Sequence, residues 1–259
     1  MSKFGWCYIG CGGIANTTAK EISKSENNRI VAVWNRGFAK AEAFAKKYGG
    51  TAYKTFEEAV NAPEVEGVYI ALTADKHAEY IKKCIKLHKP VMCEKPFTVS
   101  AQDAEEIFAL AKTEGVYVTE AMWTWHNAAA RQVKSWMEAG RIGEVKDVNI
   151  VYAFPMIQFS RSDRLTDPKR LGGAIMEIGI YGLRYCVELF GMPNQIACEG
   201  RVQGGHRPGR DGGSHLRQLY RPLPLRAGQE GGRVRHDHRN GRRDHRTLFP
   251  HGKIRQDQG

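Results

Sequence analysis

The sequence predicts an α/β fold, with a doubly wound parallel sheet followed by a second region that contains a strand with one wet face. Three observations lead to this prediction. Short apolar runs alternate with helical stretches over the first 120 residues. A glycine-rich loop joins the first apolar run to the first helical stretch. After Gly140 the chain changes to a run of alternating apolar and polar residues, as in a strand with one face in water.

The first 120 residues contain five predicted strands, each a short apolar run. These runs are Lys3–Gly10, Arg29–Asn35, Gly67–Leu72, Pro90–Cys93 and Val116–Thr119. The stretches with apolar residues at helical spacing are Ala15–Ser25, Ala39–Tyr48, Phe56–Asn61, His77–Leu87 and Ser100–Gly115. Strands that alternate with helices form βαβ units around a parallel sheet. Because such crossovers are nearly always right-handed, we expect a doubly wound sheet of the Rossmann type.

The composition is typical of a globular protein in a reducing compartment. Of the 259 residues, 42% are hydrophobic and 26% are charged, which excludes a largely disordered chain. No apolar run approaches the roughly 18 residues that would span a bilayer, and the N-terminus lacks the layout of a signal peptide. The six cysteines form no CxxC pair, which argues against a zinc site or a disulfide framework. A cytoplasmic location is therefore expected.

The net charge of +11 is unevenly distributed. The last 60 residues hold 14 of the 39 Lys and Arg residues but only 5 of the 28 Asp and Glu residues. The first 199 residues are therefore close to neutral, and the total charge does not indicate a nucleic-acid partner. A basic tail that binds nucleic acid is an alternative for the last 60 residues alone, although they lack zinc-ligand spacing, interleaved aromatic residues and a helical basic stripe.

The strongest local motif is the glycine loop after the first predicted strand. The residues Gly10, Gly12 and Ala15 fit the pattern G-x-G-x-x-A. The first glycine permits a tight turn, the second lets the backbone approach a pyrophosphate, and the small third residue lets helix and strand pack closely. We expect a dinucleotide to bind at the loop that comprises Gly10, Gly12, Gly13, Ile14 and Ala15. A plain glycine turn is the alternative.

The end of the second predicted strand distinguishes between the two nicotinamide cofactors. An NAD site has an acidic residue there, which binds the ribose hydroxyls. This chain has Asn35 and Arg36 instead. The amide of Asn35 can still bind the ribose, and the guanidinium of Arg36 suits a 2′-phosphate. The sequence therefore favours NADP over NAD, unless Arg36 is only a solvated surface residue.

Further motifs follow the glycine loop in order along the chain. They are Lys40–Tyr48, His77–Tyr80, Glu94-Lys95-Pro96, Glu120–Thr124, Gly140–Glu144, and Gly172-Gly173-Ala174 with Glu177–Tyr181. The ordered set resembles the glucose-fructose oxidoreductase / inositol dehydrogenase (Gfo/Idh/MocA) family over about residues 3–200. The Glu120–Thr124 motif and Tyr181 resemble the branch of dihydrodiol dehydrogenases and NADP-dependent xylose dehydrogenases.

The resemblance implies hydride transfer between NADP(H) and a carbinol or carbonyl carbon of a sugar, polyol or vicinal diol, with no metal. It implies that Tyr181 accepts the hydroxyl proton and that Lys95 contacts nicotinamide ribose and substrate. An ammonium near a phenol favours the phenolate, which a free phenol with a pKa of about 10 would rarely form at neutral pH. Cofactor contacts are also implied for Thr73, His77 and Glu94. Without the resemblance, Lys95 would be a solvated loop lysine and Tyr181 a core aromatic.

The resemblance also implies that the second region is an α+β domain with a mostly antiparallel sheet, and it implies a substrate pocket and partners. The residues expected to border the pocket are Trp123, Trp125, His126 and Glu177, and many members have Asp at the position of Glu177. The expected partner is a small sugar or diol, without a membrane, and a homo-oligomer would form through the open face of an intact second sheet. A non-catalytic NADP-binding regulator, or an inactive truncated member, is the alternative function.

The sequence divides into three segments with boundaries near residues 120 and 200. Residues 1–120 form the predicted Rossmann domain, and 121–200 a partial substrate and dimerisation domain with a strand at Val145–Phe154 and a helix at Gly172–Phe190. Residues 201–259 contain 13 Arg, one Lys and few apolar residues, without a helical or strand period. Such a segment cannot bury enough surface to offset its chain entropy. We expect a disordered tail or a reading-frame shift near residues 200–204, which would leave the second sheet incomplete.

Overall fold

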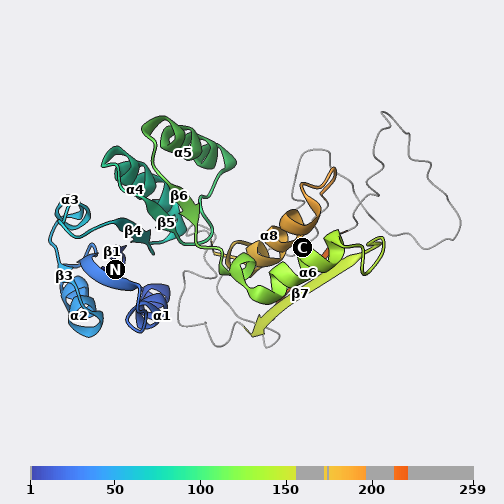
Figure 1. Cartoon of the computed structure of the whole chain (residues 1–259), viewed down its shortest axis with the longest axis horizontal. Helices are drawn as coiled ribbons and strands as arrows, with labels where there is room; N and C mark the ends of the chain where they lie inside the picture. The colour runs from blue at the N-terminus through green and yellow to red at the C-terminus, as the bar shows by residue number, and fades with distance from the viewer. Residues whose placement is uncertain (1, 156–171, 174, 197–212, 221–259) are drawn as a thin grey trace, which may run out of the picture. The chain divides into compact units, whose positions relative to one another are not determined.

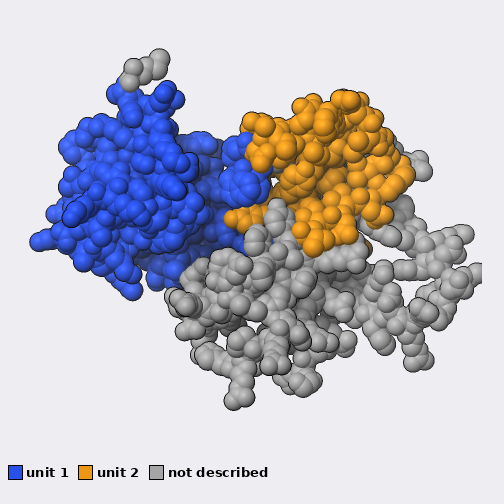
Figure 2. Space-filling model, turned by 90° about the horizontal axis from the view of Figure 1, so that it is seen from below, with its two compact units in different colours: residues 1–126, 162–180 blue, residues 127–161, 181–259 orange. Residues whose placement is uncertain are grey.

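A computed structural model describes residues 2–155, 172–173, 175–196 and 213–220 of the chain (Figure 1). The chain divides into two compact units (Figure 2). The first comprises residues 1–126 and 162–180, and the second comprises 127–161 and 181–259. The boundaries predicted near residues 120 and 200 stay predictions.

The first unit is built on a six-stranded parallel sheet in the order β3-β2-β1-β4-β5-β6. The strands are β1 (Phe4–Ile9), β2 (Asn28–Trp34), β3 (Thr51–Ala52), β4 (Gly67–Ile70), β5 (Val91–Cys93) and β6 (Val118–Glu120). This is the strand order of the doubly wound dinucleotide-binding fold. The predicted Rossmann-type sheet is therefore confirmed. The order reverses between β1 and β4, and the carboxyl ends of these two strands form the edge where such folds bind ligands.

The helices of the first unit follow the strands in alternation. They are α1 (Gly13–Ile22), α2 (Phe38–Tyr48), α3 (Phe56–Val60), α4 (Ala74–Lys86) and α5 (Ala101–Glu114), with a short 3₁₀ helix η1 (Trp123–His126) after β6. Ser100 caps α5, as its side chain accepts a hydrogen bond from the N–H of Asp103 at 3.0 Å. Gly115 ends the helix in a left-handed conformation. Within the described ranges, no helix combines the length and apolar character needed to cross a membrane.

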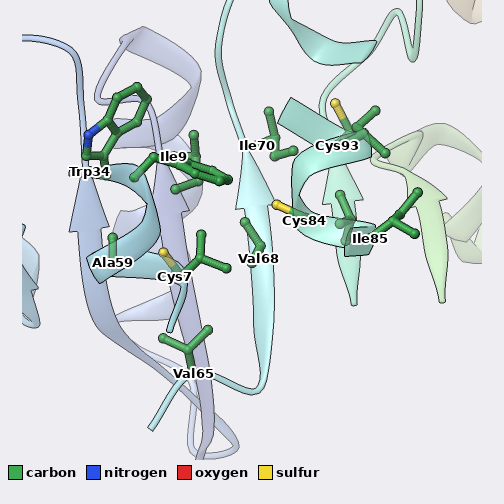
Figure 3. Packing of buried hydrophobic residues seen from close by; sticks show 14 of the residues in the cluster. Cys7, Ile9, Trp34, Ala59, Val65, Val68, Ile70, Cys84, Ile85 and Cys93 are labelled. Carbon is green, nitrogen blue, oxygen red and sulfur yellow. The ribbon is translucent and has the colours of Figure 1, made fainter. Parts of the chain in front are cut away.

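One face of the parallel sheet packs against α3, α4 and α5. Figure 3 shows this cluster, in which strand residues Cys7, Ile9, Trp34, Val68, Ile70 and Cys93 meet helix residues Ala59, Cys84 and Ile85. Successive residues of a strand point to opposite faces, so Cys7 and Ile9 lie in this cluster while Tyr8 between them does not. Each large aliphatic side chain buried here stabilises the fold by about 1.5–3 kcal/mol.

The other face of the sheet packs against α1 and α2. Its buried residues are Tyr8, Ile30, Val33, Tyr69 and Ala71 from or beside the strands, with Ala15, Ala19, Ala41 and Phe44 from the helices. The small alanines of α1 let this helix lie close to the strands, as the third position of the glycine motif predicts. The rings of Tyr8 and Tyr69 lie 4.9 Å apart between their centroids, so two hydroxyl groups enter this otherwise apolar layer.

The second unit contains α6 (Ala128–Glu138), β7 (Val148–Pro155), most of α8 (Ile180–Phe190) and β8 (Gly213–Tyr220). The strands β7 and β8 pair antiparallel, with Ile150 opposite Gln218. The strand β7 agrees with the predicted run Val145–Phe154. The strand β8 lies in the segment for which the sequence showed no strand period, and its backbone pairing with β7 supplies the order that its side-chain pattern does not.

The region before α8 differs from the predicted helix Gly172–Phe190. A π-helical turn, η4 (Ile175–Gly179), comes first, and regular α-helix begins at Ile180. Glycine at positions 172, 173 and 179 lowers the helical preference of this stretch. π-Helical turns are frequent at functional sites, and this one carries Glu177.

Candidate cofactor and catalytic site

The glycine loop adopts a geometry that only glycine allows at its first position. Gly10 has φ +99°, and a Cβ there would lie 2.6 Å from the carbonyl oxygen of Ala71. The N–H of Gly10 donates to the carbonyl oxygen of Trp34 at 2.8 Å, which fixes the turn against β2. At Gly12 and Gly13 a Cβ would meet no atom within 4 Å. The protein therefore leaves the backbone bare at the two positions where a pyrophosphate must approach.

The N-terminus of α1 points out of this loop without a cap. Gly12 is the N-cap residue and offers no side-chain hydrogen bond, and the first turn contains no acidic residue. The N–H groups of Gly13, Ile14 and Ala15 are thus the donors that the helix presents to an anion. Ala15 is buried and packs in the cluster between α1 and the sheet, whereas Ile14 is half-exposed and faces outward. This arrangement fits the diphosphate of a dinucleotide, as the motif predicts.

Asn35 and Arg36 follow β2 beside the glycine loop. The side-chain oxygen of Asn35 accepts a hydrogen bond from the N–H of Cys11 at 3.4 Å, and its amide donates to the carbonyl of Gly37 at 3.1 Å. Asn35 therefore ties the two loops together. Arg36 is exposed, so its guanidinium is accessible to a ligand.

Lys40 is a second cation at this end of the site that the sequence analysis did not single out. It lies in the first turn of α2 and is exposed. Burial raises the pKa of the Cys11 thiol to about 11, and the positive charge of Lys40 opposes this shift. That interaction puts Lys40 within electrostatic range of the glycine loop. Lys40 follows Arg36 by four positions and lies in the first turn of the helix that begins at Phe38. This short spacing along the sequence could have identified Lys40 as a second cation near Arg36.

The loop that begins at Glu94 lies at the carboxyl end of β5, on the edge where doubly wound sheets bind ligands. Glu94 is 8% exposed and accepts hydrogen bonds from the Tyr69 hydroxyl and, at 3.2 Å, from the N–H of Lys95. The Lys95–Pro96 peptide bond is cis. The N–H of Phe97 donates to the carboxylate of Glu120 at 2.9 Å. Side chains from β4 and β6 thus hold both ends of this loop.

Lys95 contacts Glu177 within the first unit. The ammonium donates to the carbonyl oxygen of Glu177 at 2.7 Å and lies 3.6 Å from its carboxylate. The two side chains are 15% and 19% exposed, so the pair is largely shielded from water. The structure brings together two residues that the sequence analysis assigned to the site, 82 positions apart.

His77 and Thr73 occupy different environments at the start of α4. His77 is 1% exposed, with Nδ1 2.9 Å from the carbonyl oxygen of Pro96 and Nε2 3.2 Å from that of Leu72. A neutral imidazole carries one N–H, so it can donate to only one of these carbonyls at a time. The ring therefore joins two loops from inside the protein, and its implied contact with a cofactor stays a prediction. Thr73 is exposed at the N-cap of α4.

The residues expected to border the substrate lie in both units. Trp123 and His126 are exposed on η1 in the first unit, and the side chain of Trp125 lies outside the described residues. Tyr181 is half-buried on α8 and belongs to the second unit. The pairing of Lys95 with Tyr181 therefore stays a prediction.

Family models match most of the chain. Residues 4–122 match the model described as "Oxidoreductase family, NAD-binding Rossmann fold", and residues 130–217 match "GFO/IDH/MocA C-terminal domain". The chain belongs to the Gfo/Idh/MocA family. The resemblance found in the ordered motifs is thereby confirmed. The match to the second model also continues into the segment that contains β8.

Among curated members of the Gfo/Idh/MocA family, the mouse trans-1,2-dihydrobenzene-1,2-diol dehydrogenase is 32% identical over 211 residues, which cover 80% of this chain and 62% of that protein. The dTDP-3,4-didehydro-2,6-dideoxy-alpha-D-glucose 3-reductase of Actinomadura kijaniata is 29% identical over 177 residues, or 68% of this chain and 53% of that protein. The chain thus spans between half and two thirds of the length of these relatives.

A solved structure shares the fold. It is a 3-ketoreductase from Actinomadura kijaniata in complex with NADP and TDP-benzene, with a TM-score of 0.66 and 27% identity. The similarity covers 73% of this chain and 58% of the ketoreductase.

Proposed function

We propose that this chain belongs to an oxidoreductase that transfers hydride between NADP(H) and a carbinol or carbonyl carbon of a sugar, polyol or vicinal diol. The observation that carries the proposal is the position of Lys95 at the carboxyl edge of the sheet that also bears the glycine loop. In a doubly wound sheet this edge is where a dinucleotide binds and reacts. The mouse dihydrodiol dehydrogenase and the bacterial ketoreductase are reasons to choose this substrate class.

The cofactor proposal rests on the chain's own residues. The bare backbone at Gly12 and Gly13 and the uncapped N-terminus of α1 fit a diphosphate. Arg36 and Lys40 supply positive charge, and no acidic residue stands at the end of β2 to bind ribose hydroxyls. These features favour NADP over NAD. The NADP complex of the ketoreductase supports the same choice.

The proposed division of labour has the cofactor supply or accept the hydride, while the chain handles the proton. Tyr181 would accept the substrate hydroxyl proton during oxidation and return it during reduction. Lys95 would orient the substrate oxygen and favour the phenolate of Tyr181. Its contact with Glu177 supports this role, because the ammonium is already held in one position before a substrate arrives.

A fluorescence titration of the purified chain with NADPH and with NADH tests the cofactor proposal first. Tight NADPH binding with much weaker NADH binding is expected. A screen of diols and sugars then follows NADPH formation at 340 nm. Turnover that disappears in Lys95→Ala and Tyr181→Phe while NADPH still binds would support the enzyme. Binding without turnover on any substrate would leave a non-catalytic NADP-binding protein as the function.

A further inference from the structure

We infer that Tyr69 is a positioning residue that fixes Lys95 through the buried carboxylate of Glu94. The inference rests on the proposed function, since it assigns a further residue to the same site. Tyr69 lies in the middle of β4, and neither the glycine motif nor the Glu94-Lys95-Pro96 motif includes it.

Glu94 is buried beside Tyr69. The residue is 8% exposed, and Tyr69, which it contacts, belongs to a buried hydrophobic cluster. A buried carboxylate is stable only when hydrogen-bond donors satisfy its oxygens. Two donors to this carboxylate are described. The Tyr69 hydroxyl donates to Oε1, and the N–H of Lys95 donates to Oε2 at 3.2 Å. Tyr69 is therefore one of the two groups on which the position of Glu94 depends.

Both hydrogen bonds of the Glu94 carboxylate help to fix the backbone of Lys95. One is made by the backbone of Lys95 itself, and the other holds the carboxylate that accepts it. The side chain of Lys95 extends away from this contact to the carbonyl of Glu177. If the Glu94 carboxylate turned away, the N–H of Lys95 would lose its acceptor. The backbone from which the Lys95 side chain extends would then no longer be held in place.

The donor, Tyr69, is itself held in place by the sheet. Tyr69 is 2% exposed and stands on a central strand, with β1 on one side and β5 on the other. Its ring contacts the ring of Tyr8 at 4.9 Å between centroids. Burial, followed by the nearby Glu94 carboxylate, raises the pKa of Tyr69 far above its usual value, so the hydroxyl keeps its proton and remains a donor at any physiological pH.

Tyr8 provides a matched control for Tyr69. It stands on the neighbouring strand, lies in the same buried layer and is also 2% exposed. Its hydroxyl lies 3.4 Å from Oγ1 of Thr18 on α1, so it is directed to a different partner. Tyr8→Phe and Tyr69→Phe therefore remove the same atom from the same layer, but only the second removes a donor to Glu94.

The experiment measures how fast Lys95 is acetylated by a low concentration of acetic anhydride in the full chain, with the modified peptide quantified by mass spectrometry. Lys95 is 15% exposed. We expect Tyr69→Phe to increase its labelling rate roughly three- to tenfold, because the loop opens more often once Glu94 lacks a donor. Tyr8→Phe should leave this rate unchanged. Alkylation of the fully buried Cys84 in the same samples reports opening of the whole unit, and it should not rise.

A double-mutant cycle tests whether Tyr69 acts through Glu94. Glu94→Gln keeps an acceptor for the tyrosine but places an amide NH₂ toward the N–H of Lys95, so it should also raise Lys95 labelling. Adding Tyr69→Phe to Glu94→Gln should then have little further effect. If Tyr69→Phe fails to fold, the Glu94→Gln variant alone tests the inference. Unchanged labelling of Lys95 in that variant would show that Glu94 does not fix Lys95.

Three results would overturn the inference: unchanged Lys95 labelling in Tyr69→Phe, an equal rise in Tyr8→Phe, or an additive cycle. The activity readout distinguishes it from the proposed function. In an active enzyme, Tyr69→Phe should lower kcat roughly tenfold, with the Kd for NADPH unchanged. Failure of the unaltered chain to bind NADPH would remove the proposed function, whereas the labelling result would stand on its own.

Discussion

The ammonium of Lys95 lies 2.7 Å from the carbonyl oxygen of Glu177, closer than the 3.6 Å that separates it from the carboxylate of the same residue. The shorter contact is made by the backbone, which any residue at position 177 would supply. The carboxylate of Glu177 is therefore not the main anchor of Lys95. The π-helical turn that presents the carbonyl is the feature that places the lysine.

Removing the Lys95 ammonium should abolish most catalysis without preventing cofactor binding. Lys95→Met keeps the length of the side chain but removes the charge and the donor to Glu177. We expect kcat to fall by about 10²- to 10⁴-fold, the range for loss of a group that assists proton transfer. The Kd for NADPH should change little, because the proposed phosphate contacts are made by the glycine loop, Arg36 and Lys40. Steady-state kinetics and NADPH fluorescence measure the two quantities.

The control for Lys95→Met is Lys112→Met, in the last turn of α5. This exposed lysine lies in none of the proposed contacts, so its variant should match the parent in both quantities. A fall in kcat that is equal in the two variants would contradict a specific role for Lys95.

Two glycines of the same loop should respond differently to alanine. At Gly10 the φ of +99° and the carbonyl of Ala71 at 2.6 Å leave no room for a Cβ, so Gly10→Ala should lower the free energy of unfolding by about 2 kcal/mol or more. At Gly12 nothing lies within 4 Å, so Gly12→Ala should fold normally. Its methyl group would instead obstruct a diphosphate and weaken NADPH binding roughly tenfold or more. Urea unfolding and fluorescence titration separate the two effects. Normal NADPH affinity in Gly12→Ala would contradict the proposed cofactor position.

Arg36 and Lys40 should determine the preference for NADPH over NADH. Each side chain is exposed, so each contact with a 2′-phosphate is partly screened by water. We expect Arg36→Ala and Lys40→Ala each to raise the Kd for NADPH about five- to tenfold. The Kd for NADH should stay the same, because NADH carries no phosphate there. Lys46→Ala, in the last turn of the same helix, is the matched control. A parallel loss of NADH affinity would show that these residues support the loop instead of reading the phosphate.

The sequence alone predicts those parts of the site that depend on local backbone requirements. The glycine loop is one, because a turn with positive φ at Gly10 and a close strand–helix contact at Ala15 require particular residues. The strands of the first unit are another, because apolar runs of this length bury well on both faces. The two-residue strand β3 is too short to produce a recognisable period.

The contacts that the sequence does not predict depend on register. Tyr69 reaches Glu94, 25 positions away, only because β4 and β5 pair in parallel with Ile70 opposite Cys93. The carbonyl of Glu177 reaches Lys95 through tertiary structure across 82 positions. β8 depends on a partner strand for the same reason. Such contacts arise from pairing and packing, which no single segment encodes.

Stability should fall above pH 10, and Tyr8 should account for part of the loss. Burial raises the pKa of Tyr8 to about 12, with the hydrogen bond between the hydroxyls of Tyr8 and Thr18 opposing the shift. Between about pH 10 and 12 an unfolded tyrosine loses its proton while the folded one keeps it, so the folded state binds more protons. The free energy of unfolding then decreases by about 1.4 kcal/mol per pH unit for each such group.

Urea unfolding between pH 9 and 11 measures this dependence. Tyr8→Phe should make the decrease less steep, whereas Tyr117→Phe, at a 70% exposed position, should not. Burial also raises the pKa values of the Cys7 and Cys93 thiols. These thiols therefore lower the free energy of unfolding in the same direction, and they contribute equally to its pH dependence in every variant. An identical slope in Tyr8→Phe and the parent would contradict the assignment.

The arginine-rich tail should prove to be a displaced reading frame. The stretch from residue 234 to 258 can be encoded by permitted codons that, read one nucleotide later, give SVMITGTDGEITVPYFHMAKFDKIK. That sequence alternates as strands do and contains a T-D-G-E turn, whereas the present one has neither property. The match to the family's C-terminal domain runs to residue 217, beyond the shift predicted near residues 200–204, so the position of the shift stays a prediction.

Sequencing of the gene and mass spectrometry of the purified chain test the displaced frame together. We expect a missing or extra nucleotide near the codons for residues 200–204, and a restored chain that is more stable and binds NADPH at least as tightly. The restored frame would supply alternating apolar residues that the stretch from residue 234 to 258 lacks, and their burial would stabilise the fold. An intact frame in independently sequenced DNA, with tryptic peptides from residues 227–259 in the protein, would contradict the prediction. The tail would then be genuine, and DNA and RNA binding at several salt concentrations would be the measurement to make on it.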